Sequence, residues 1–451
     1  MVARILAVLL LVLAGAARAD AVEIKEVVSP GGIKAWLVEQ HTIPLIAMDY
    51  EFEGGTSVEP KGKEGLAYLV SGLLNEGAGD MDSLAFQKAL DSRAIRMSFD
   101  AGRDTFTGEV KTLTGEKDEA FRLLGLALSE PRFDADAVER VREQVHSIQL
   151  SEDDEPRSVA SKAWMKAAFA GHPYAHNLTG TPESLAGLTV DDLRGYVKDN
   201  FAKDRLIVGV VGDITPEELG PLLDKAFGAL PAKGETIDVP ETGLDHPQPS
   251  VDVIDRDIPQ SVGVFGMAGI KRDDPDWYAA LVMNHILGSG GFSSRLMEEV
   301  RRKRGLTYGV YTYLVPYDHA GLLLGTVATV NARMGESKSV IENVIANMAH
   351  NGATEDELKD AKTYLTGSYA LNFDTSGAIA GQLVGIQHYG FGRDYIDKRN
   401  SYIEAVTLDD VNRVAKRLLK PDSLFWVIVG EPKGLDKTPG ASMKTPETST
   451  P

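Results

Sequence analysis

Histidines are the side chains of this chain best suited to metal binding, but their spacing does not favour a metal site. The 451-residue sequence has nine histidines and no cysteine, so it has no thiolate for metal or redox chemistry. Only His172 and His176 have the i, i+4 spacing that places two imidazoles on one helical face. Pro173 lies between them and no glutamate accompanies them, which predicts a loop with solvent-facing imidazoles.

A glycine-rich run, Gly-Ser-Gly-Gly at residues 288–291, has the composition of a phosphate-binding loop. It follows a helix-like stretch rather than a strand, and no Gly-Lys-Ser/Thr sequence comes after it. The run therefore predicts a flexible turn that leads into a helix beginning near Ser293.

Residues 65–77 have the apolar stripe of a core helix, formed by Leu66, Leu69, Val70, Leu73 and Leu74. The segment also resembles the Gly-Leu-Ala-His-x-x-Glu-His-Met helix of the M16 (pitrilysin/insulinase) metallopeptidases, where two histidines bind zinc beside a catalytic glutamate. Tyr68, Ser71 and Gly72 occupy those three positions. A phenol, a hydroxyl and a hydrogen supply neither good zinc ligands nor a general base. We therefore expect this helix to be part of the core and not a zinc site.

The resemblance covers nearly the whole chain after its first residues. The first half contains Gly-His-Pro-Tyr at residues 171–174 and Gly-Thr-Pro-Glu-Ser-Leu at residues 180–185. The second half contains Gly-Gly-Phe-Ser-Ser-Arg-Leu at residues 290–296 and Arg-Arg-Lys-Arg-Gly-Leu-Thr-Tyr-Gly-Val at residues 301–310. The order and spacing of these motifs imply the M16 architecture, a duplicated α+β half that pairs with another such chain around an enclosed chamber.

The resemblance also locates a third zinc ligand, a glutamate on a later helix. The corresponding region here, residues 144–150, contains no carboxylate, and Glu143 lies just outside it. We therefore predict that this chain holds no metal and no other cofactor, and that zinc belongs to a partner chain with an intact His-x-x-Glu-His motif.

Arg301 and Tyr308 match a second M16 constellation, an arginine and a tyrosine seven residues later that reach the substrate near the metal. The resemblance implies that Arg301 donates hydrogen bonds to substrate carbonyl oxygens. It implies that the Tyr308 hydroxyl stabilises the oxygen that becomes negative as water attacks. Arg301 should end a helix, and Tyr308 should open a strand after a turn at Gly305. The alternative is a surface arginine in a basic run and a tyrosine packed at a strand edge.

An internal repeat organises the elements that must position these residues. Thr189 and Thr407, and likewise Gly212 and Gly430, are separated by the same 218 positions (407 minus 189, and 430 minus 212). Each copy reads as a threonine-capped helix followed by a buried strand that ends in glycine. Such a match indicates a duplicated domain.

The predicted fold class is α+β, with two duplicated domains that each have a mainly antiparallel sheet and helices packed on one face. We place the N-terminal M16-like domain at residues 22–232 and the C-terminal one at residues 250–432. Residues 233–249 read as a linker because they are rich in Gly, Pro, Thr and acidic residues. Residues 433–451 read as a disordered tail.

The first residues read as a secretory signal peptide. Arg4 precedes an apolar run over residues 5–17, and Ala17-Arg18-Ala19 precedes Asp20, which predicts cleavage after residue 19. An uncleaved N-terminal anchor is the alternative. No later stretch of the sequence is apolar enough for a membrane span. Export would place the mature protein in the periplasm or outside the cell, and we predict the periplasm.

The mature chain is strongly acidic. Removing Arg4 and Arg18 takes the formal net charge from -19 to -21 (-19 minus 2), so nucleic acid and anionic membrane surfaces are poor partners. The acidity would attract a basic peptide, although it is more simply explained as a contribution to solubility.

These features predict the non-catalytic subunit of a periplasmic heterodimeric M16 zinc peptidase, which binds peptide or unfolded polypeptide through Arg301 and Tyr308. The chain alone would then be inactive. A structural or peptide-binding scaffold without a proteolytic role is the main alternative. An independently active peptidase with an unorthodox metal site is a third possibility.

Overall fold

The computed structural model describes residues 23–236, 238–244 and 250–435. The predicted signal peptide and nearly all of the predicted tail lie outside the described residues. In the described part, no helix is both long enough and apolar enough to cross a membrane.

The N-terminal half is built on a six-stranded sheet in which only β2 and β8 pair in parallel. Its strand order is β1 (Lys25–Val28), β2 (Lys34–Glu39), β8 (Leu206–Gly212), β3 (Leu45–Glu53), β7 (Thr105–Leu113) and β6 (Arg96–Ala101). Its core also contains side chains of α2 (Leu66–Leu73), α4 (Lys117–Ser129), α5 (Ala135–Asp154), α8 (Val190–Asn200) and α9 (Pro216–Phe227). The predicted apolar stripe of α2 is buried in this core.

The C-terminal half repeats the arrangement on a five-stranded sheet in which only β13 and β9 pair in parallel. The order is β11 (Val310–Pro316), β12 (Gly321–Val330), β10 (Gln260–Ala268), β13 (Phe425–Gly430) and β9 (Ser250–Asp255). Its own helices include α10 (Trp277–Asn284), α11 (Met334–Asn351), α12 (Glu355–Gly367) and α15 (Leu408–Leu418). The predicted class, α+β with mainly antiparallel sheets, is confirmed.

The predicted repeat has matching local structure in both halves. Thr189 caps α8 and Thr407 caps α15, each in a capping box with an aspartate three residues later. That reciprocal bonding satisfies two otherwise unpaired backbone donors at each helix start. Each capped helix leads to a central strand, β8 or β13, so the two copies occupy equivalent places in their sheets.

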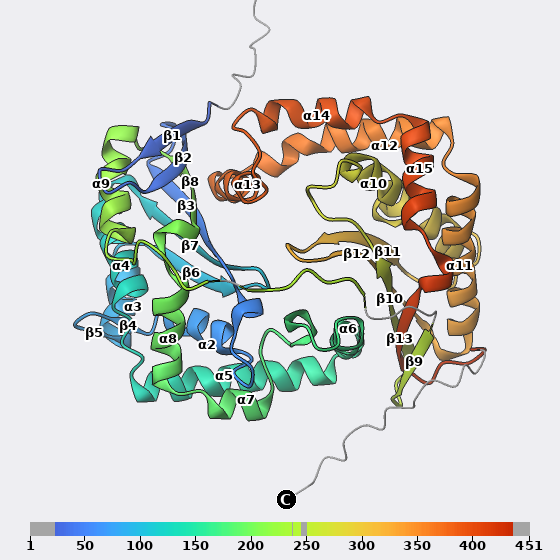
Figure 1. The fold of residues 1–451 in the computed structure, drawn as a ribbon, viewed down its shortest axis with the longest axis horizontal. Coiled ribbons are helices and arrows are strands. Elements are labelled where there is room, and N and C mark those ends of the chain that lie inside the picture. Colours follow the sequence, from blue (N-terminus) through green and yellow to red (C-terminus); the bar gives the residue numbers. More distant parts are fainter. Residues whose placement is uncertain (1–22, 237, 245–249, 436–451) are drawn as a thin grey trace, which may run out of the picture.

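The two halves exchange helices (Figure 1). Helix α6 (Pro156–Ala168) of the N-terminal half packs on the C-terminal sheet, and α13 (Ser376–His388) packs on the N-terminal sheet. In β13, Phe425 and Val427 face α6 while Trp426 and Ile428 face the helices of their own half. Because side chains alternate along a strand, each central strand is buried on both faces. This explains why these strands read as continuous apolar runs.

Trp164 of α6 anchors this exchange. Its side chain is 1% exposed, and its Nε1 donates to the carbonyl oxygen of Phe425 at 3.1 Å. Gly266 of β10 leaves room for it, since a Cβ there would lie 2.7 Å from the indole. The corresponding close approach at the other sheet is made by Gly209 of β8, where a Cβ would lie 2.6 Å from the carbonyl oxygen of Ala380 on α13.

Candidate functional site

Helix α2 keeps its place in the core but has no zinc-binding side chains at the three motif positions. The buried Ser71 hydroxyl donates to the carbonyl oxygen of Tyr68 at 2.8 Å. Tyr68 is half-buried, and burial raises the pKa of its phenol, assisted by the charges of Asp100 and Glu152. At Gly72 an added Cβ would lie 2.8 Å from a methyl of Val141 on α5. Restoring a histidine there would therefore require Val141 to move.

The N-terminus of α2 is held by Glu59, which the sequence reasoning missed. Its carboxylate accepts the backbone N–H groups of Gly65 at 3.0 Å and Ala67 at 2.7 Å. Burial raises the pKa of Glu59 to about 8, against the lowering effect of these hydrogen bonds. No capping-box spacing marks this contact in the sequence, so only the fold identifies it.

Helix α5 carries the region that the resemblance assigns to the third zinc ligand. Glu143 is exposed on this helix, and Gln149, inside the region 144–150, is buried. The Gln149 side-chain amide donates to the carbonyl oxygen of Thr179 at 2.8 Å, so it joins α5 to the following loop. Among the described residues, no three His, Cys, Asp or Glu side chains form a group that could hold a metal ion.

Arg301 lies near the end of a helical segment whose last turns are η7 (Met297–Arg302). Gly305, with φ of +61°, ends the segment: its N–H donates to the carbonyl oxygen of Arg301 and that of Leu306 to Val300. Glycine commonly ends a helix in this left-handed conformation because it has no Cβ. The Arg301 guanidinium lies 4.6 Å from the ring centroid of Phe292, whose side chain is 76% exposed.

The other cations of this basic run are all neutralised. Arg302 pairs with Glu298, Lys303 with Glu299 and Glu298, and Arg304 with Glu299. Arg301 has no acidic partner among the described residues. It is the one member of the run, within the part of the chain that the structure describes, with its charge free to bind a ligand.

Tyr308 was expected to open a strand, and this detail is wrong, because β11 begins two residues later at Val310. The side chain of Thr307 holds the chain in a turn here: its hydroxyl donates to the carbonyl oxygen of Ala328 at 2.7 Å and accepts the N–H of Gly309 at 3.1 Å. Tyr308 is 84% exposed, so it is not packed at a strand edge.

The prediction of solvent-facing imidazoles is wrong for His172. Its side chain is buried, its Nε2 lies 2.9 Å from the carbonyl oxygen of Pro240, and its Nδ1 accepts the N–H of Tyr174. Burial lowers the pKa of His172. The ring packs edge-on against Tyr174, so the Gly-His-Pro-Tyr motif fixes a loop. His176 is half-exposed.

The expected flexible turn at residues 288–291 is partly helical. Helix α10 continues as a π-turn, η5 (His285–Ser289), before the chain turns at Gly291 with φ of +58°. Gly288 must lack a side chain because a Cβ would lie 2.2 Å from the Thr312 hydroxyl on β11. The glycines therefore allow close packing against the start of β11.

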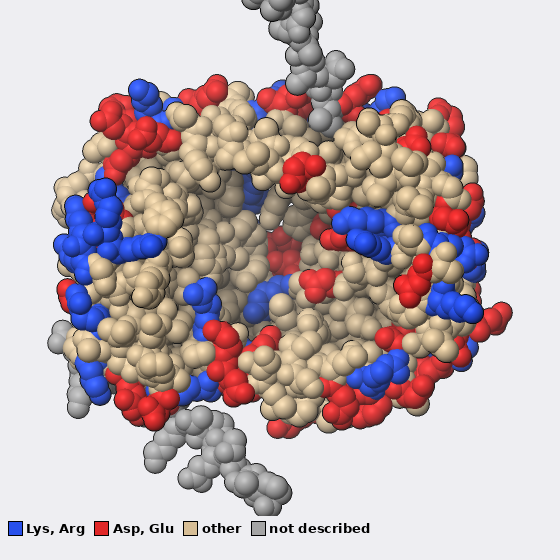
Figure 2. All heavy atoms as spheres, turned by 180° about the vertical axis from the view of Figure 1, so that it is seen from behind, with Lys and Arg blue, Asp and Glu red and all other residues tan. Residues whose placement is uncertain are grey.

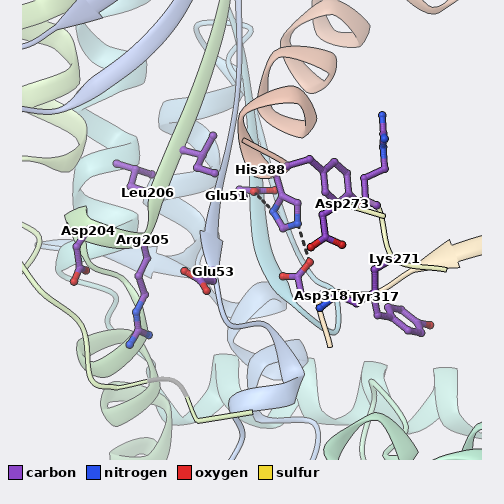
Figure 3. A pocket seen from close by; sticks show the side chains of 13 residues that line it. Glu51, Glu53, Asp204, Arg205, Leu206, Lys271, Asp273, Tyr317, Asp318 and His388 are labelled. Carbon is purple, nitrogen blue, oxygen red and sulfur yellow. Dashed lines mark hydrogen bonds and ion pairs between the residues drawn. The ribbon is translucent and has the colours of Figure 1, made fainter. Parts of the chain in front are cut away.

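His388 forms an ionic clasp between the halves that sequence reasoning did not find (Figure 3). Its Nδ1 lies 2.8 Å from a carboxylate oxygen of Glu51 on β3, and its Nε2 lies 2.9 Å from Asp318 in the β11–β12 turn. These carboxylates raise the pKa of His388 to about 10. The clasp lines an open pocket of about 430 Å³. No local pattern predicts it, because its members lie far apart in the chain.

His388→Gln is expected to reduce the sensitivity of this protein to alkaline pH. The ordinary pKa of 6.5 for histidine rises to about 10 on folding. The clasp therefore makes its full contribution to the stability of the folded state below pH 6.5, and this contribution is lost as pH rises toward 10. Between pH 7 and 10 the Tm of the wild type should fall at least about 2 °C further than that of the variant. His350→Gln, at an exposed position on α11, is the control. Equal pH slopes in all three proteins would contradict the clasp.

Comparison with known proteins agrees with this geometry. Residues 187–365 match the family model described as "Peptidase M16 inactive domain". A solved structure from Pseudomonas fluorescens, described as a peptidase M16 inactive domain, superposes with a TM-score of 0.85 at 28% identity, covering 92% of this chain and 99% of that one. The chain resembles M16 peptidases over most of its length. A Helicobacter pylori protease structure, with a TM-score of 0.82 and 18% identity over 91% of this chain and 100% of that one, shows the shared fold.

Curated M16 relatives span most of both chains. The Helicobacter pylori "Non-peptidase homolog YmxG" is 28% identical over 396 residues, 88% of this chain and 91% of the relative. The Bacillus subtilis "Uncharacterized zinc protease YmxG" is 24% identical and covers 90% of this chain and 98% of its own. The "Probable mitochondrial-processing peptidase subunit beta" of Schizosaccharomyces pombe is 26% identical over 399 residues, 85% of this chain and 86% of the relative. The chain thus shares the M16 fold with relatives named as a non-peptidase homologue, a zinc protease and a processing-peptidase subunit.

Proposed function

We propose that this chain is the non-catalytic subunit of a periplasmic heterodimeric M16 zinc peptidase. In this proposal it binds a peptide or unfolded segment through Arg301 and Tyr308 and completes the active site of a partner with an intact His-x-x-Glu-His helix. The periplasmic location rests on the signal-peptide pattern of residues 1–19.

One observation carries the proposal: Arg301 and Tyr308 are free to contact a ligand, whereas the cations next to Arg301 are held in ion pairs. Three cations directly after Arg301 are held by Glu298 and Glu299, but Arg301 rests on an exposed phenylalanine. Tyr308 is 84% exposed. A large exposed aromatic beside an unpaired arginine is the composition of a binding hot spot and is poorly explained by packing.

The two side chains have complementary chemistry. The Arg301 guanidinium has several N–H donors and no acceptor, so it can hold the carbonyl oxygens of an extended peptide. The neutral Tyr308 hydroxyl can donate to a carbonyl oxygen as negative charge develops on it. A zinc ion held by the partner would supply the activated water. Neither Arg301 nor Tyr308 can replace that function.

Reconstitution tests the proposal directly. The purified chain should contain no stoichiometric zinc by metal analysis and should leave an unfolded test polypeptide intact, with or without added zinc. Adding the M16 chain with the intact zinc motif should produce cleavage at least about tenfold faster than that partner alone. Tightly bound zinc in the isolated chain would refute the proposal. Stable association with no change in cleavage would instead favour the scaffold.

A further inference from the structure

Strand β11 carries a row of tyrosines on one face. Tyr311 and Tyr313 are each 43% exposed, while Thr312 between them is buried on the opposite face of the strand. Gly309 lets the ring of Tyr311 lie over the backbone before β11, since a Cβ there would lie 2.7 Å from the ring. Large side chains so open to solvent at alternate positions are unusual for a strand that only packs a core.

The row continues to the other half of the molecule. Tyr317 follows β11, and the Arg103 guanidinium, in the turn between β6 and β7, lies 5.9 Å from its ring centroid. Burial raises the pKa of Tyr313 and Tyr317 adds to the rise, whereas the charge of Arg157 on α6 opposes it. Tyr313 and Tyr317 therefore lie toward the N-terminal half. The β11–β12 hairpin points into the space between the halves (Figure 1), where Figure 2 shows that the molecule is hollowed.

Arg103 also lines a pocket of about 710 Å³ between α6, the end of α5 and the loop after residue 170. Two acidic groups also line this pocket: Glu152 lies 3.0 Å from Lys162, and Glu64 lies 4.0 Å from the imidazole of His176. Arg103 and Lys166, by contrast, have no carboxylate partner among the described residues. In a chain of formal net charge -19, this pocket offers uncompensated positive charge to an anionic group.

We infer that an extended peptide lies along Tyr308, Tyr311, Tyr313 and Tyr317, with its C-terminal carboxylate in the pocket beside Arg103 and Lys166. Nine residues separate the first and last of these tyrosines, and at about 3.3 Å per residue an extended peptide of that length spans about 30 Å. Tyrosines offer flat apolar contact and a hydroxyl for the peptide backbone, while the two cations complement a carboxylate. The inference rests on the proposed function only because the peptide path begins at Tyr308.

Peptide binding by the isolated chain provides the test. The probe is a neutral decapeptide with an N-terminal fluorophore and a free C-terminus, followed by fluorescence anisotropy. The double variant Tyr311→Ala/Tyr313→Ala should bind at least about tenfold more weakly than wild type, because it loses two aromatic contacts. Tyr402→Ala is the matched control, since Tyr402 is 40% exposed but lies on α14 (Tyr395–Ala405), outside the row. It should bind like wild type.

A separate measurement tests the binding of the peptide's C-terminal carboxylate. A C-terminally amidated decapeptide, and the variant Lys166→Glu with the free acid, should each bind about fivefold or more weakly. Wild-type affinity in the tyrosine double variant, or no binding by the wild type at millimolar peptide, would overturn the inference. Equal binding of acid and amide would overturn the placement of the C-terminus.

These results are separable from the proposed function because the binding assay needs no partner. Tyrosine-dependent binding without activation of the zinc-bearing partner would support the peptide path and contradict the completion role. Activation of the partner, together with equal peptide binding when Tyr311 and Tyr313 are replaced, would support the completion role and contradict the peptide path.

Discussion

Tyr308→Phe and Arg301→Ala should each lower kcat/KM of the reconstituted peptidase by about tenfold or more, because each removes a donor that contacts the reacting peptide. The two effects should differ in kind. Removing the Tyr308 hydroxyl takes away a bond that strengthens only as charge develops, so kcat should fall. Removing the Arg301 guanidinium takes away a bond made already in the bound substrate, so KM should rise.

Arg302→Ala provides the matched control for these variants. Arg302 is the next residue, carries the same charge and is paired with Glu298 on the exposed surface. Its loss should change kcat/KM by less than about twofold. Co-purification of each variant with the partner establishes that the complex is intact. Wild-type turnover in an intact complex that lacks Arg301 or the Tyr308 hydroxyl would contradict the completion role and favour a scaffold.

Trp164→Ala should lower the free energy of unfolding by about 3–5 kcal/mol, the range for truncation of a buried large aromatic. The indole is 1% exposed between α6 and the C-terminal sheet, and its N–H satisfies the carbonyl oxygen of Phe425. The variant leaves a cavity and an unpaired backbone acceptor. Urea-induced unfolding followed by circular dichroism measures the loss.

Trp164→Phe separates packing from the hydrogen bond, since it retains much of the aromatic volume and should cost less than the alanine variant. A loss below about 1 kcal/mol in Trp164→Ala would show that α6 contributes little to the union of the halves. Because α13 makes the reciprocal contact with the N-terminal sheet, we expect both halves of the wild-type protein to unfold together.

Much of the architecture is predictable because it depends on local patterns. The capped helices at Thr189 and Thr407 have the Thr-x-x-Asp spacing of a capping box. The strands that follow read as buried because they are apolar at every position. The apolar spacing of residues 66–74 predicts the buried face of α2. Such patterns act within a few residues, where backbone geometry links spacing to direction.

The details of the candidate site were less predictable. Arg301 and Tyr308 follow from a motif, but whether a charge is paired depends on which carboxylates lie within reach, and Glu298 and Glu299 neutralise every neighbour except Arg301. The buried position of His172 depends on Pro240, 68 residues away. The clasp at His388 joins groups separated by 337 and 70 residues, and no periodicity spans such distances.

The sequence by itself determined that α2 lacks the zinc ligands of the M16 motif, because Tyr68, Ser71 and Gly72 have no suitable donor atoms whatever their positions. It also determined the duplicated α+β halves through local patterns of capping and hydrophobicity. Only the tertiary structure decided which helix covers the second face of each sheet, which cation of the basic run stays unpaired, and which tyrosines stay exposed. Those properties arise from contacts between distant segments, and burial and pairing exist only once the chain has folded.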